Sequence, residues 1–364
     1  MTRIAVVGAG AVGCYLAARL SDGGHQITLV ARGDQRAAIA RDGLLLREPH
    51  GEARRYRLQT VETLVERPDL VLLAVKTPDV AQACAAIRPF VAGVPVLALQ
   101  NGVRADHIAA SVLGREAVLG AVVMCAASYV QPGEVFLQFP GWLILGEPFR
   151  SVDDRARDIA RVLDRALPTY ITPHLRRVRW SKLIANLNNA LCAATGLTAP
   201  EVGSTPLGRM LSLQVMKEGA AVALTAGIRF DHGLYGLSPR ALRRDPHAAL
   251  FALLQASFTT LLVRLPERAA LQVLAAAGRS RLNRLPVRFS LWQSIVRGRP
   301  SEIDYLNGEI VRLGARVGRP TPYNAHLVAL VRQVARTQTF CRLEDLVPPE
   351  ARRFPVLAPA AGGQ

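Results

Sequence analysis

Lysine is nearly absent from this chain of 364 residues, where only Lys76, Lys182 and Lys217 occur among 45 lysines and arginines. Arginine stays protonated in proteins, whereas the pKa of a lysine can be lowered until it gives up its proton. A lysine retained against such a bias is therefore a candidate for a task that arginine cannot perform, although chance survival explains any single one equally well.

Cysteine is scarce too, and its five positions are scattered, with no CxxC pair: Cys14, Cys84, Cys125, Cys192 and Cys341. The odd number and the spacing argue against a disulfide framework and against a zinc site. Reduced thiols in a cytoplasmic protein are the expectation. The sequence starts with a strand-like run and no apolar h-region, so no signal peptide is predicted.

Long hydrophobic runs are also missing. The longest stretches without Asp, Glu, Lys or Arg are Leu183–Pro200 and Pro246–Val263, and both contain several polar residues. A helix that spans a bilayer needs about 20 predominantly apolar residues. Buried or subunit-packing helices fit these stretches better, so no membrane partner is expected.

The formal net charge of +17 suggests nucleic-acid binding as one function. The arginines are spread along the whole chain, however, with only short clusters at 176–179 and 240–244, and no nucleic-acid-binding motif accompanies them. We therefore expect no nucleic-acid partner and interpret the charge as a compositional bias that also attracts anionic ligands.

The first half of the chain alternates short apolar runs with helical patterns, which predicts a doubly wound parallel α/β sheet of the Rossmann type. Strands are expected at Arg3–Val7, Gln26–Val30, Leu70–Ala74, Val96–Leu99 and Val118–Met124, and helices at Ala11–Ser21, Asp79–Arg88 and Ala105–Val112. An antiparallel hairpin is expected over Glu134–Gly146. Ser151 with Asp154 is expected to cap a helix that ends at Leu163.

From about Leu175 onward the pattern is almost entirely helical, with breaks at prolines. We expect an NADP-binding domain over residues 1–170, with a linker near Pro168–Pro173. An all-α domain that carries the substrate and catalytic residues is expected over 174–345. The tail, 346–364, is predicted to be disordered.

A glycine-rich turn, GAGAVG at Gly8–Gly13, lies between the first expected strand and helix. In this context the motif is typical of dinucleotide-binding sites. Gly8 allows the tight turn, Gly10 lets the backbone approach a pyrophosphate, and Gly13 lets helix and strand pack closely. The helix N-terminus offers unpaired N–H groups to the phosphates. A glycine-rich turn without a ligand is the alternative.

Arg32 follows the second expected strand, where NAD enzymes usually carry an acidic residue that bonds the ribose 2′-OH. A guanidinium can instead bind a 2′-phosphate through two hydrogen bonds. The sequence thus predicts NADPH rather than NADH. Asp34 would compete for the ribose if the strand ran further than expected.

Lys76 and Asn101 each follow a buried strand, at the carboxyl edge where sheets of this kind bind ligands. The Asn101 side chain could bond the nicotinamide amide or its ribose. An isolated Asn-Gly pair, however, is more often only a turn.

Lys182, Asn186 and Asn189 are spaced by four and three residues, which places them on one face of an expected helix. A polar face among apolar neighbours is a poor candidate for pure core, and a solvated stripe is the alternative. Lys217, beside Glu218, has no comparable neighbours and is expected at the surface.

A second group of polar residues surrounds a turn at Arg299–Pro300: Ser290, Gln293, Glu302 and Asp304. The Glu302 carboxylate could hold an ammonium group or a substrate hydroxyl. An exposed carboxylate at a helix N-terminus is the alternative.

In their order along residues 3–335, these motifs resemble the ketopantoate reductase (2-dehydropantoate 2-reductase) family. The shared features are GxGxxG, a basic residue after strand two, Lys76, Asn101, WxKLxxN at Trp180–Asn186, SxxQ at Ser290–Gln293, EID at Glu302–Asp304 and GRPTPYN at Gly318–Asn324. The resemblance implies NADPH-dependent reduction of 2-dehydropantoate, a small anionic 2-oxo acid, to pantoate on the route to coenzyme A.

The resemblance also implies residue roles. Cofactor contacts would come from Gly8, Ala9, Gly10, Ala11, Val12, Gly13, Arg32, Lys76, Asn101 and Ala126. Substrate contacts would come from Asn101, Asn186, Asn189, Ser290 and Gln293. Lys182 would be the proton donor, with Glu302 beside the reacting pair. A lysine can stabilise charge on the keto oxygen and then protonate it, if an apolar pocket or a nearby cation lowers its pKa toward neutrality.

Three departures from the family pattern leave the substrate open. Ala190 stands where a second asparagine is usual, with Asn189 as its replacement, and Ser294 stands where an acidic residue is usual. The Arg-rich segment His232–Arg284 is expanded and could reshape the pocket or build the contact of a homodimer. A related NADPH enzyme that acts on another 2-oxo acid or an imine is the alternative. An NADPH-sensing module without turnover is the third hypothesis.

Overall fold

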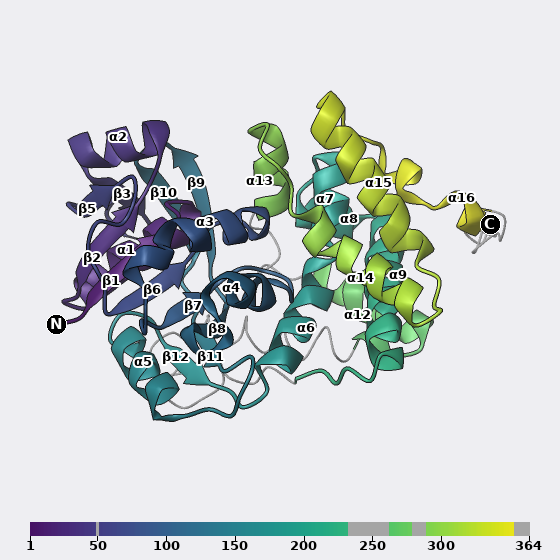
Figure 1. The fold of residues 1–364 in the computed structure, drawn as a ribbon. Helices are drawn as coiled ribbons and strands as arrows, with labels where there is room; N and C mark the ends of the chain where they lie inside the picture. Colours follow the sequence, from purple (N-terminus) through teal and green to yellow (C-terminus); the bar gives the residue numbers. More distant parts are fainter. Residues whose placement is uncertain (49–50, 232–261, 279–288, 353–364) are drawn as a thin grey trace. The chain divides into compact units, whose positions relative to one another are not determined.

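The computed structural model of the protein describes residues 1–48, 51–231, 262–278 and 289–352 (Figure 1). The described residues divide into two compact units, one formed by 1–48, 51–183 and 230–231 and the other by 184–229, 262–278 and 289–352. The division falls within helix α6 (Leu175–Asn186).

The first unit is built on an eight-stranded sheet of order β12-β11-β8-β7-β6-β1-β2-β5. Its strands are β1 (Arg3–Val7), β2 (Gln26–Val30), β5 (Gln59–Val61), β6 (Leu70–Leu73), β7 (Val96–Ala98), β8 (Val118–Val123), β11 (Leu143–Gly146) and β12 (Thr169–Ile171). The pairs are parallel, apart from β8 with β11, which is antiparallel. The predicted doubly wound α/β sheet is confirmed, with this one antiparallel pair added.

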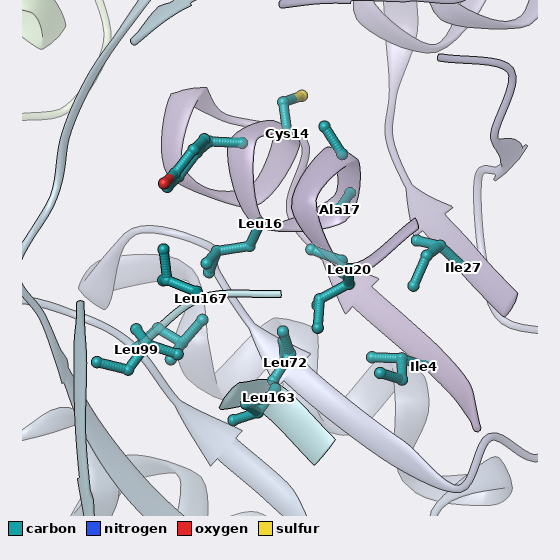
Figure 2. Packing of buried hydrophobic residues seen from close by; sticks show 14 of the residues in the cluster. Ile4, Cys14, Leu16, Ala17, Leu20, Ile27, Leu72, Leu99, Leu163 and Leu167 are labelled. Atoms are coloured by element: carbon teal, nitrogen blue, oxygen red, sulfur yellow. The ribbon is translucent and has the colours of Figure 1, made fainter. Parts of the chain in front are cut away.

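Alternate residues of each central strand enter opposite cores, because successive side chains of a strand point to opposite faces. Ile4 and Val6 pack on the face covered by α1 (Ala11–Asp22) and α5 (Asp154–Asp164). Ala5 and Val7 pack on the other, against α3 (Val80–Ile87) and α4 (Ala105–Leu113). Figure 2 shows the first of these cores, with Leu16, Leu20, Ile27, Leu72 and Leu163 among its side chains. Burial on both faces explains why these strands are continuous apolar runs.

The predicted hairpin over Glu134–Gly146 is wrong, because its two strands belong to different sheets. β10 (Glu134–Phe139) lies in a four-stranded sheet of order β4-β3-β10-β9, formed with β3 (Leu44–Arg47), β4 (Arg54–Tyr56) and β9 (Ala126–Gln131). The chain crosses back to the large sheet at Gly141. This residue has φ of +58°, and a Cβ there would lie 1.8 Å from the carbonyl oxygen of Met124. Only glycine fits such a crossing.

Two local expectations also changed. The cap of α5 is Asp153, whose carboxylate accepts a hydrogen bond of 2.9 Å from the N–H of Ala156, and not Ser151 with Asp154. The segment expected to be a linker, Pro168–Pro173, contains β12, whose residues Thr169–Ile171 are good strand formers and pair in parallel with β11.

The regular elements of the second unit are all helices among the described residues, as predicted. Its helices are α7 (Asn189–Thr195), α8 (Ala199–Ser204), α9 (Pro206–Thr225), α12 (Glu267–Gly278), α13 (Ser290–Val296), α14 (Asn307–Arg316), α15 (Pro322–Thr337) and α16 (Pro349–Arg352). Of the expanded segment and the predicted tail, residues 232–261, 279–284 and 353–364 lie outside the described residues. Within the described part of the chain, no helix has the length and apolar character of a membrane span.

Two fully buried asparagines, Asn307 of α14 and Asn324 of α15, bond to each other, to α9 and to the turn between α6 and α7. Asn307 Nδ2 donates to the carbonyl of Leu187 at 3.2 Å and to Asn324 Oδ1 at 2.9 Å. Asn324 Nδ2 donates in turn to the carbonyl of Val215 at 3.2 Å and to Glu218 Oε1 at 2.8 Å. The asparagine that ends the GRPTPYN segment is therefore part of the internal framework of the helical unit.

Lys217 is not a surface residue, contrary to expectation. It is half-buried on α9, and its Nζ donates a hydrogen bond of 2.9 Å to the carbonyl of Leu265. An ammonium group that bonds a main-chain carbonyl stabilises the end of a segment, a role that explains its partial burial without any catalytic function.

Candidate active site

The three glycines of the GAGAVG turn are required for different reasons. Gly8 has φ of +112°, and a Cβ there would lie 2.7 Å from the N atom of Val75. A Cβ at Gly13 would lie 1.9 Å from the carbonyl oxygen of Gly8, so packing alone demands both glycines. Gly10 differs, since its φ of −76° suits any residue and no atom of the described residues lies within 4 Å of its Cβ position. The space beside Gly10 is open, which fits the close approach of a pyrophosphate.

The peptide between Ala9 and Gly10 is held in one orientation. The carbonyl of Ala9 accepts hydrogen bonds from Gln35 Nε2 at 3.0 Å and from the Cys14 thiol at 3.4 Å. Because C=O and N–H point in opposite directions across a trans peptide, the N–H of Gly10 is directed away from Gln35. Gly10 is also the N-cap of α1 and brings no side chain to the first N–H groups of that helix. These N–H groups suit an anion.

Arg32 is an exposed cation just beyond the end of β2. β2 ends at Val30, and Arg32 is the exposed N-cap of α2 (Gly33–Asp42). Asp34 is in the first turn of that helix, so the longer strand that would have brought it to the ribose does not form. The cation is thus placed at the carboxyl end of the strand next to β1.

Lys76 and Asn101 occupy loops that one side chain ties together. Gln100 Nε2 donates to the carbonyl of Leu73 at 2.8 Å and to that of Val75 at 3.1 Å. Val75 precedes Lys76, and Gln100 precedes Asn101, so the two loops are fixed to each other at the ends of β6 and β7. Sequence reasoning missed Gln100, because nothing local marks a side chain whose partners are carbonyls of another strand.

Lys182 reaches the end of the next strand. Its Nζ donates a hydrogen bond to the carbonyl of Val123, the last residue of β8. Burial raises the pKa of the nearby Cys125 thiol to about 12, and the positive charge of Lys182 opposes that rise. The ammonium group therefore lies between the end of β8 and the start of β9 at Ala126.

One edge of the sheet thus collects most of the predicted site. The strands β1, β2, β6, β7 and β8 are parallel, so their carboxyl ends lie on the same edge. The residues that follow these ends are Gly8–Gly13, Arg32, Lys76, Asn101 and Ala126, and Lys182 reaches the same edge from α6. Ligands of open α/β sheets bind at this edge.

The continuous helix expected over Lys182–Asn189 is interrupted. α6 ends at Asn186, and α7 begins at Asn189, which is only 7% exposed. At the break, the carbonyl of Leu187 accepts from the N–H of Ala190 at 3.2 Å and from Asn307 Nδ2, also at 3.2 Å. The carbonyl of Leu187 is thus occupied by the N–H three residues later and by a distant side chain, and not by the N–H four residues later that a continuous helix would use. Because the helix is interrupted here, Asn189 does not continue the face of Lys182 and Asn186.

The remaining predicted residues belong to the helical unit. Ser290 and Gln293 are half-buried on α13, three residues apart. Glu302 is 5% exposed and precedes the short 3₁₀ helix Ile303–Tyr305, so it is not the exposed carboxylate of the alternative interpretation. Ser294, where an acid is usual, donates its hydroxyl to the carbonyl of Ser290 at 3.1 Å.

Two family models match this chain. The model described as "Ketopantoate reductase PanE/ApbA" matches residues 4–148, and its C-terminal counterpart matches residues 174–335. The chain belongs to the ketopantoate reductase family. It is therefore an oxidoreductase of a family whose substrate is a small 2-oxo acid and whose coenzyme is a nicotinamide dinucleotide, as the sequence resemblance implied.

Individual relatives agree with the family over most of their length. A 2-dehydropantoate 2-reductase of Pyrococcus horikoshii is 26% identical over 332 residues, which cover 91% of this chain and 96% of the relative. The structure of a ketopantoate reductase of this family from Ralstonia eutropha JMP134 is 30% identical with a TM-score of 0.72, covering 92% and 99%. D-mandelate dehydrogenase in its ternary structure with NADH and anilino(oxo)acetate shares the fold, with a TM-score of 0.76 and 22% identity over 92% and 98%.

Proposed function

We propose that this ketopantoate reductase family member reduces 2-dehydropantoate to pantoate with NADPH, as a step of pantothenate and coenzyme A biosynthesis. The observation that carries the proposal is the position of Lys182 at the sheet edge that also holds the glycine turn, Lys76 and Asn101. Family membership and the 2-dehydropantoate 2-reductases among the relatives support it. A cytoplasmic location and a homodimer stay predictions from the sequence.

The chemistry divides between the coenzyme and the protein. Bound reduced nicotinamide supplies the hydride that reduces the keto carbon. Lys182 stabilises the negative charge that develops on the keto oxygen and then donates a proton to it. The hydrogen bond from Lys182 to Val123 orients the ammonium group for this task.

The other assigned residues bind and orient. Asn101 contacts both coenzyme and substrate, and Asn186, Asn189, Ser290 and Gln293 hold the substrate. Glu302 is a buried carboxylate, and we assign it to the reacting pair.

NADPH is the proposed coenzyme because of the end of β2. Arg32 is exposed there. Asp34, the carboxylate nearest to it along the sequence, is part of α2 and not of the strand end. A guanidinium binds a 2′-phosphate through charge-assisted hydrogen bonds, whereas an NAD enzyme needs an acceptor for the 2′-OH.

The alternative substrate is another 2-oxo acid or an imine. Two positions of the chain, Ala190 and Ser294, favour this alternative. Ala190, where a second asparagine is usual, is 0% exposed in α7, so this position offers no polar group to a ligand. The Ser294 hydroxyl donates its hydrogen bond to the carbonyl of Ser290 in the same helix. A pocket that lacks these two polar groups recognises a different set of substrate oxygens.

The experiment that separates these functions is NADPH oxidation by the purified protein with ketopantoate beside a panel of 2-oxo acids and cyclic imines. We expect the highest kcat/KM with ketopantoate. A higher value with another compound would replace the substrate and keep the reaction type. NADPH binding without turnover of any carbonyl compound would identify a sensing module instead.

A further inference from the structure

Arg179 is a buried cation on α6, one turn before Lys182. Its side chain is 4% exposed and donates to the carbonyl of Gln100 at 2.9 Å, to the carbonyl of Ala98 at 3.0 Å, and to Asp106 Oδ1 at 2.6 Å. Asp106 lies in the first turn of α4, and its side chain is 5% exposed. Arginine can satisfy three acceptors in one plane because its guanidinium is a rigid fork, which lysine cannot imitate.

The acceptors of Arg179 belong to the loop that carries Asn101. Gln100 precedes Asn101, and its side chain bonds the carbonyls of Leu73 and Val75 at the end of β6. A continuous series of hydrogen bonds therefore runs from the residue before Lys76, through Gln100, to the helix that carries Lys182.

Lys182 uses the same helix face. It is three residues after Arg179, so the two side chains are neighbours on α6. Arg179 bonds the end of β7, and Lys182 bonds the end of β8, the adjacent strand. Two cations in succession thus fix α6 at the carboxyl edge of the sheet.

Strand β8 has a glycine, Gly120, where it faces the ion pair of Arg179 and Asp106. A Cβ at Gly120 in β8 would lie 2.8 Å from Arg179 Nη2, 2.8 Å from Asp106 Oδ1 and 2.6 Å from Leu175 Cδ2. The chain therefore gives up a strand-forming residue to make room for the pair. Buried ion pairs add little net stability compared with apolar packing, so stability alone does not account for this arrangement.

We propose that Arg179 is a positioning residue, which fixes α6 against the ends of β7 and β8 so that the Lys182 ammonium is held beside Asn101. The inference rests on the proposed role of Lys182 as the proton donor. Since an error of about 1 Å in the placement of a reacting group can cost about 100-fold in rate, a residue that sets this placement acts on kcat without touching the substrate.

A double-mutant cycle with Lys182 tests this role. We expect Arg179→Met to lower kcat by about 100-fold and to raise the Kd of NADPH by a much smaller factor, through the loop that carries Asn101. In the Lys182→Ala background the same substitution should change the residual rate by only about two-fold, because no ammonium group is left to place. An equal loss in both backgrounds would show a merely structural role and overturn the proposal.

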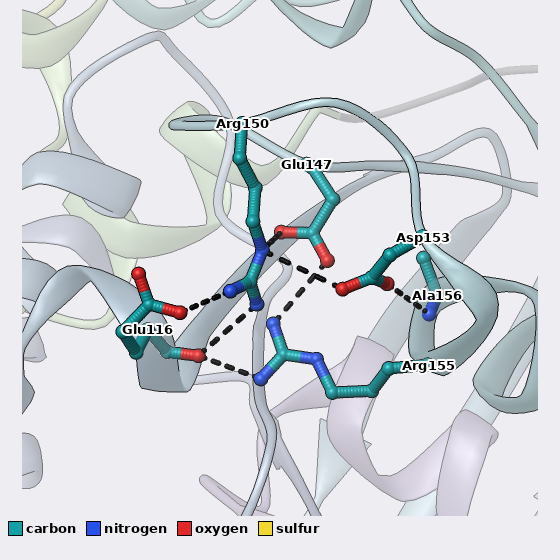
Figure 3. A network of polar contacts seen from close by, with 6 residues as sticks. All are labelled: Glu116, Glu147, Arg150, Asp153, Arg155 and Ala156. Atoms are coloured by element: carbon teal, nitrogen blue, oxygen red, sulfur yellow. Dashed lines mark hydrogen bonds and ion pairs between the residues drawn. The ribbon is translucent and has the colours of Figure 1, made fainter.

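A matched control removes another arginine of the same unit that bonds a buried carboxylate. Arg155 bonds Glu147 at 3.2 Å and the carbonyl of Glu116 at 2.6 Å (Figure 3). Glu147 lies at the opposite end of β11 from the partner of Lys182. It follows Gly146, which pairs with Gly120, whereas Val123 pairs with Leu143. Arg155→Met should therefore lower the melting temperature and keep kcat. Arg179→Lys, which retains the buried charge but not the fork, gives the same test if Arg179→Met does not fold, and we expect it too to lower kcat.

A second measurement does not depend on turnover. Since the chain has three lysines, labelling with [ε-¹³C]lysine gives three resonances, which Lys76→Arg and Lys217→Arg assign. Arg179→Met should move the Lys182 resonance, whereas the Lys217 resonance should stay unchanged. Arg155→Met should move none of the three. An unmoved Lys182 resonance would overturn the proposal. If the wild-type protein turns over no carbonyl compound, the proposed function fails, and a moved resonance still shows that Arg179 places Lys182.

Discussion

The side-chain amide of Gln35 donates a hydrogen bond of 3.0 Å to the carbonyl of Ala9 and thereby fixes the peptide that precedes Gly10. Its amide oxygen accepts from the N–H of Gly133 at 2.8 Å, so the amide is itself held at both ends. A residue of α2 therefore orients the turn between β1 and α1, although it belongs to no part of the glycine motif.

Replacing Gln35 with Leu should weaken coenzyme binding, because the Ala9 peptide would lose the donor that keeps the N–H of Gly10 directed at the phosphates. We expect the Kd of NADPH to rise by about ten-fold, the effect of losing about 1.4 kcal/mol of binding free energy. Fluorescence titration measures this change. Gln59→Leu is the control, since Gln59 lies on the edge strand β5 and accepts a hydrogen bond from the Thr28 hydroxyl of β2. An equal effect there would contradict the role of Gln35.

Alanine at Gly10 and alanine at Gly13 should have opposite consequences. Gly10→Ala places its methyl group where the described residues leave open space, so the melting temperature should hold while the Kd of NADPH rises by about ten-fold or more. Gly13→Ala presses on the carbonyl of Gly8 and should lower the free energy of unfolding by about 3 kcal/mol. Thermal melts with and without NADPH measure both. Stability loss at Gly10 with unchanged binding would mean that its neighbourhood serves packing only.

Arg32→Asp should reverse the coenzyme preference. The substitution removes a charge-assisted contact worth about 1.5–3 kcal/mol, so the ratio of kcat/KM with NADPH to that with NADH should fall by about 10- to 100-fold. A carboxylate at this position also repels a 2′-phosphate and accepts from a 2′-OH. Kinetics with both coenzymes measure the ratio, and Arg36→Asp, one turn further along α2, is the matched control. An unchanged preference in Arg32→Asp would assign the selection to another residue.

Lys182→Arg should be nearly as inactive as Lys182→Ala, although it keeps the positive charge. Arginine can stabilise the charge on the keto oxygen, but it does not readily give up its proton. Loss of general acid catalysis predicts a fall in kcat of about 10²- to 10⁴-fold, with NADPH binding retained. Steady-state kinetics and a binding titration measure the two quantities separately. Near-normal turnover in the arginine variant would exclude proton donation by this residue.

The features that the sequence predicted are those encoded locally. The GAGAVG turn, the strands of the parallel core and the residues that follow them are set by short-range periodicity and by glycine geometry. The pattern over Glu134–Gly146 correctly indicated two strands, but it could not show which strands they pair with. That pairing depends on Gly141, where the chain passes from one sheet to the other.

The features that the sequence did not predict depend on distant partners. The break before Asn189 involves Asn307, which bonds a carbonyl that a continuous helix would use. Gln100 and Arg179 bond main-chain carbonyls that only the folded sheet brings together. In a chain where nearly every cation is arginine, residue type gave Arg179 no distinction from its neighbours.

Glu147 should make the stability of the protein depend on pH. Its side chain is 1% exposed, and burial raises its pKa from 4.5 to about 7, although the charge of Arg150 opposes the rise. Between pH 4.5 and pH 7 the folded protein keeps a proton on Glu147 that the unfolded chain has released. The contribution of the protonated Glu147 to the free energy of unfolding is therefore complete below pH 4.5, and it is lost as the pH rises through 7. Glu147→Gln removes this titration. The melting temperature of the wild type relative to the variant should thus be higher at pH 5 than at pH 8, by on the order of a few degrees. A wild-type advantage that grows with pH would show instead that the ion pairs with Arg150 and Arg155 keep the carboxylate ionised in the folded protein.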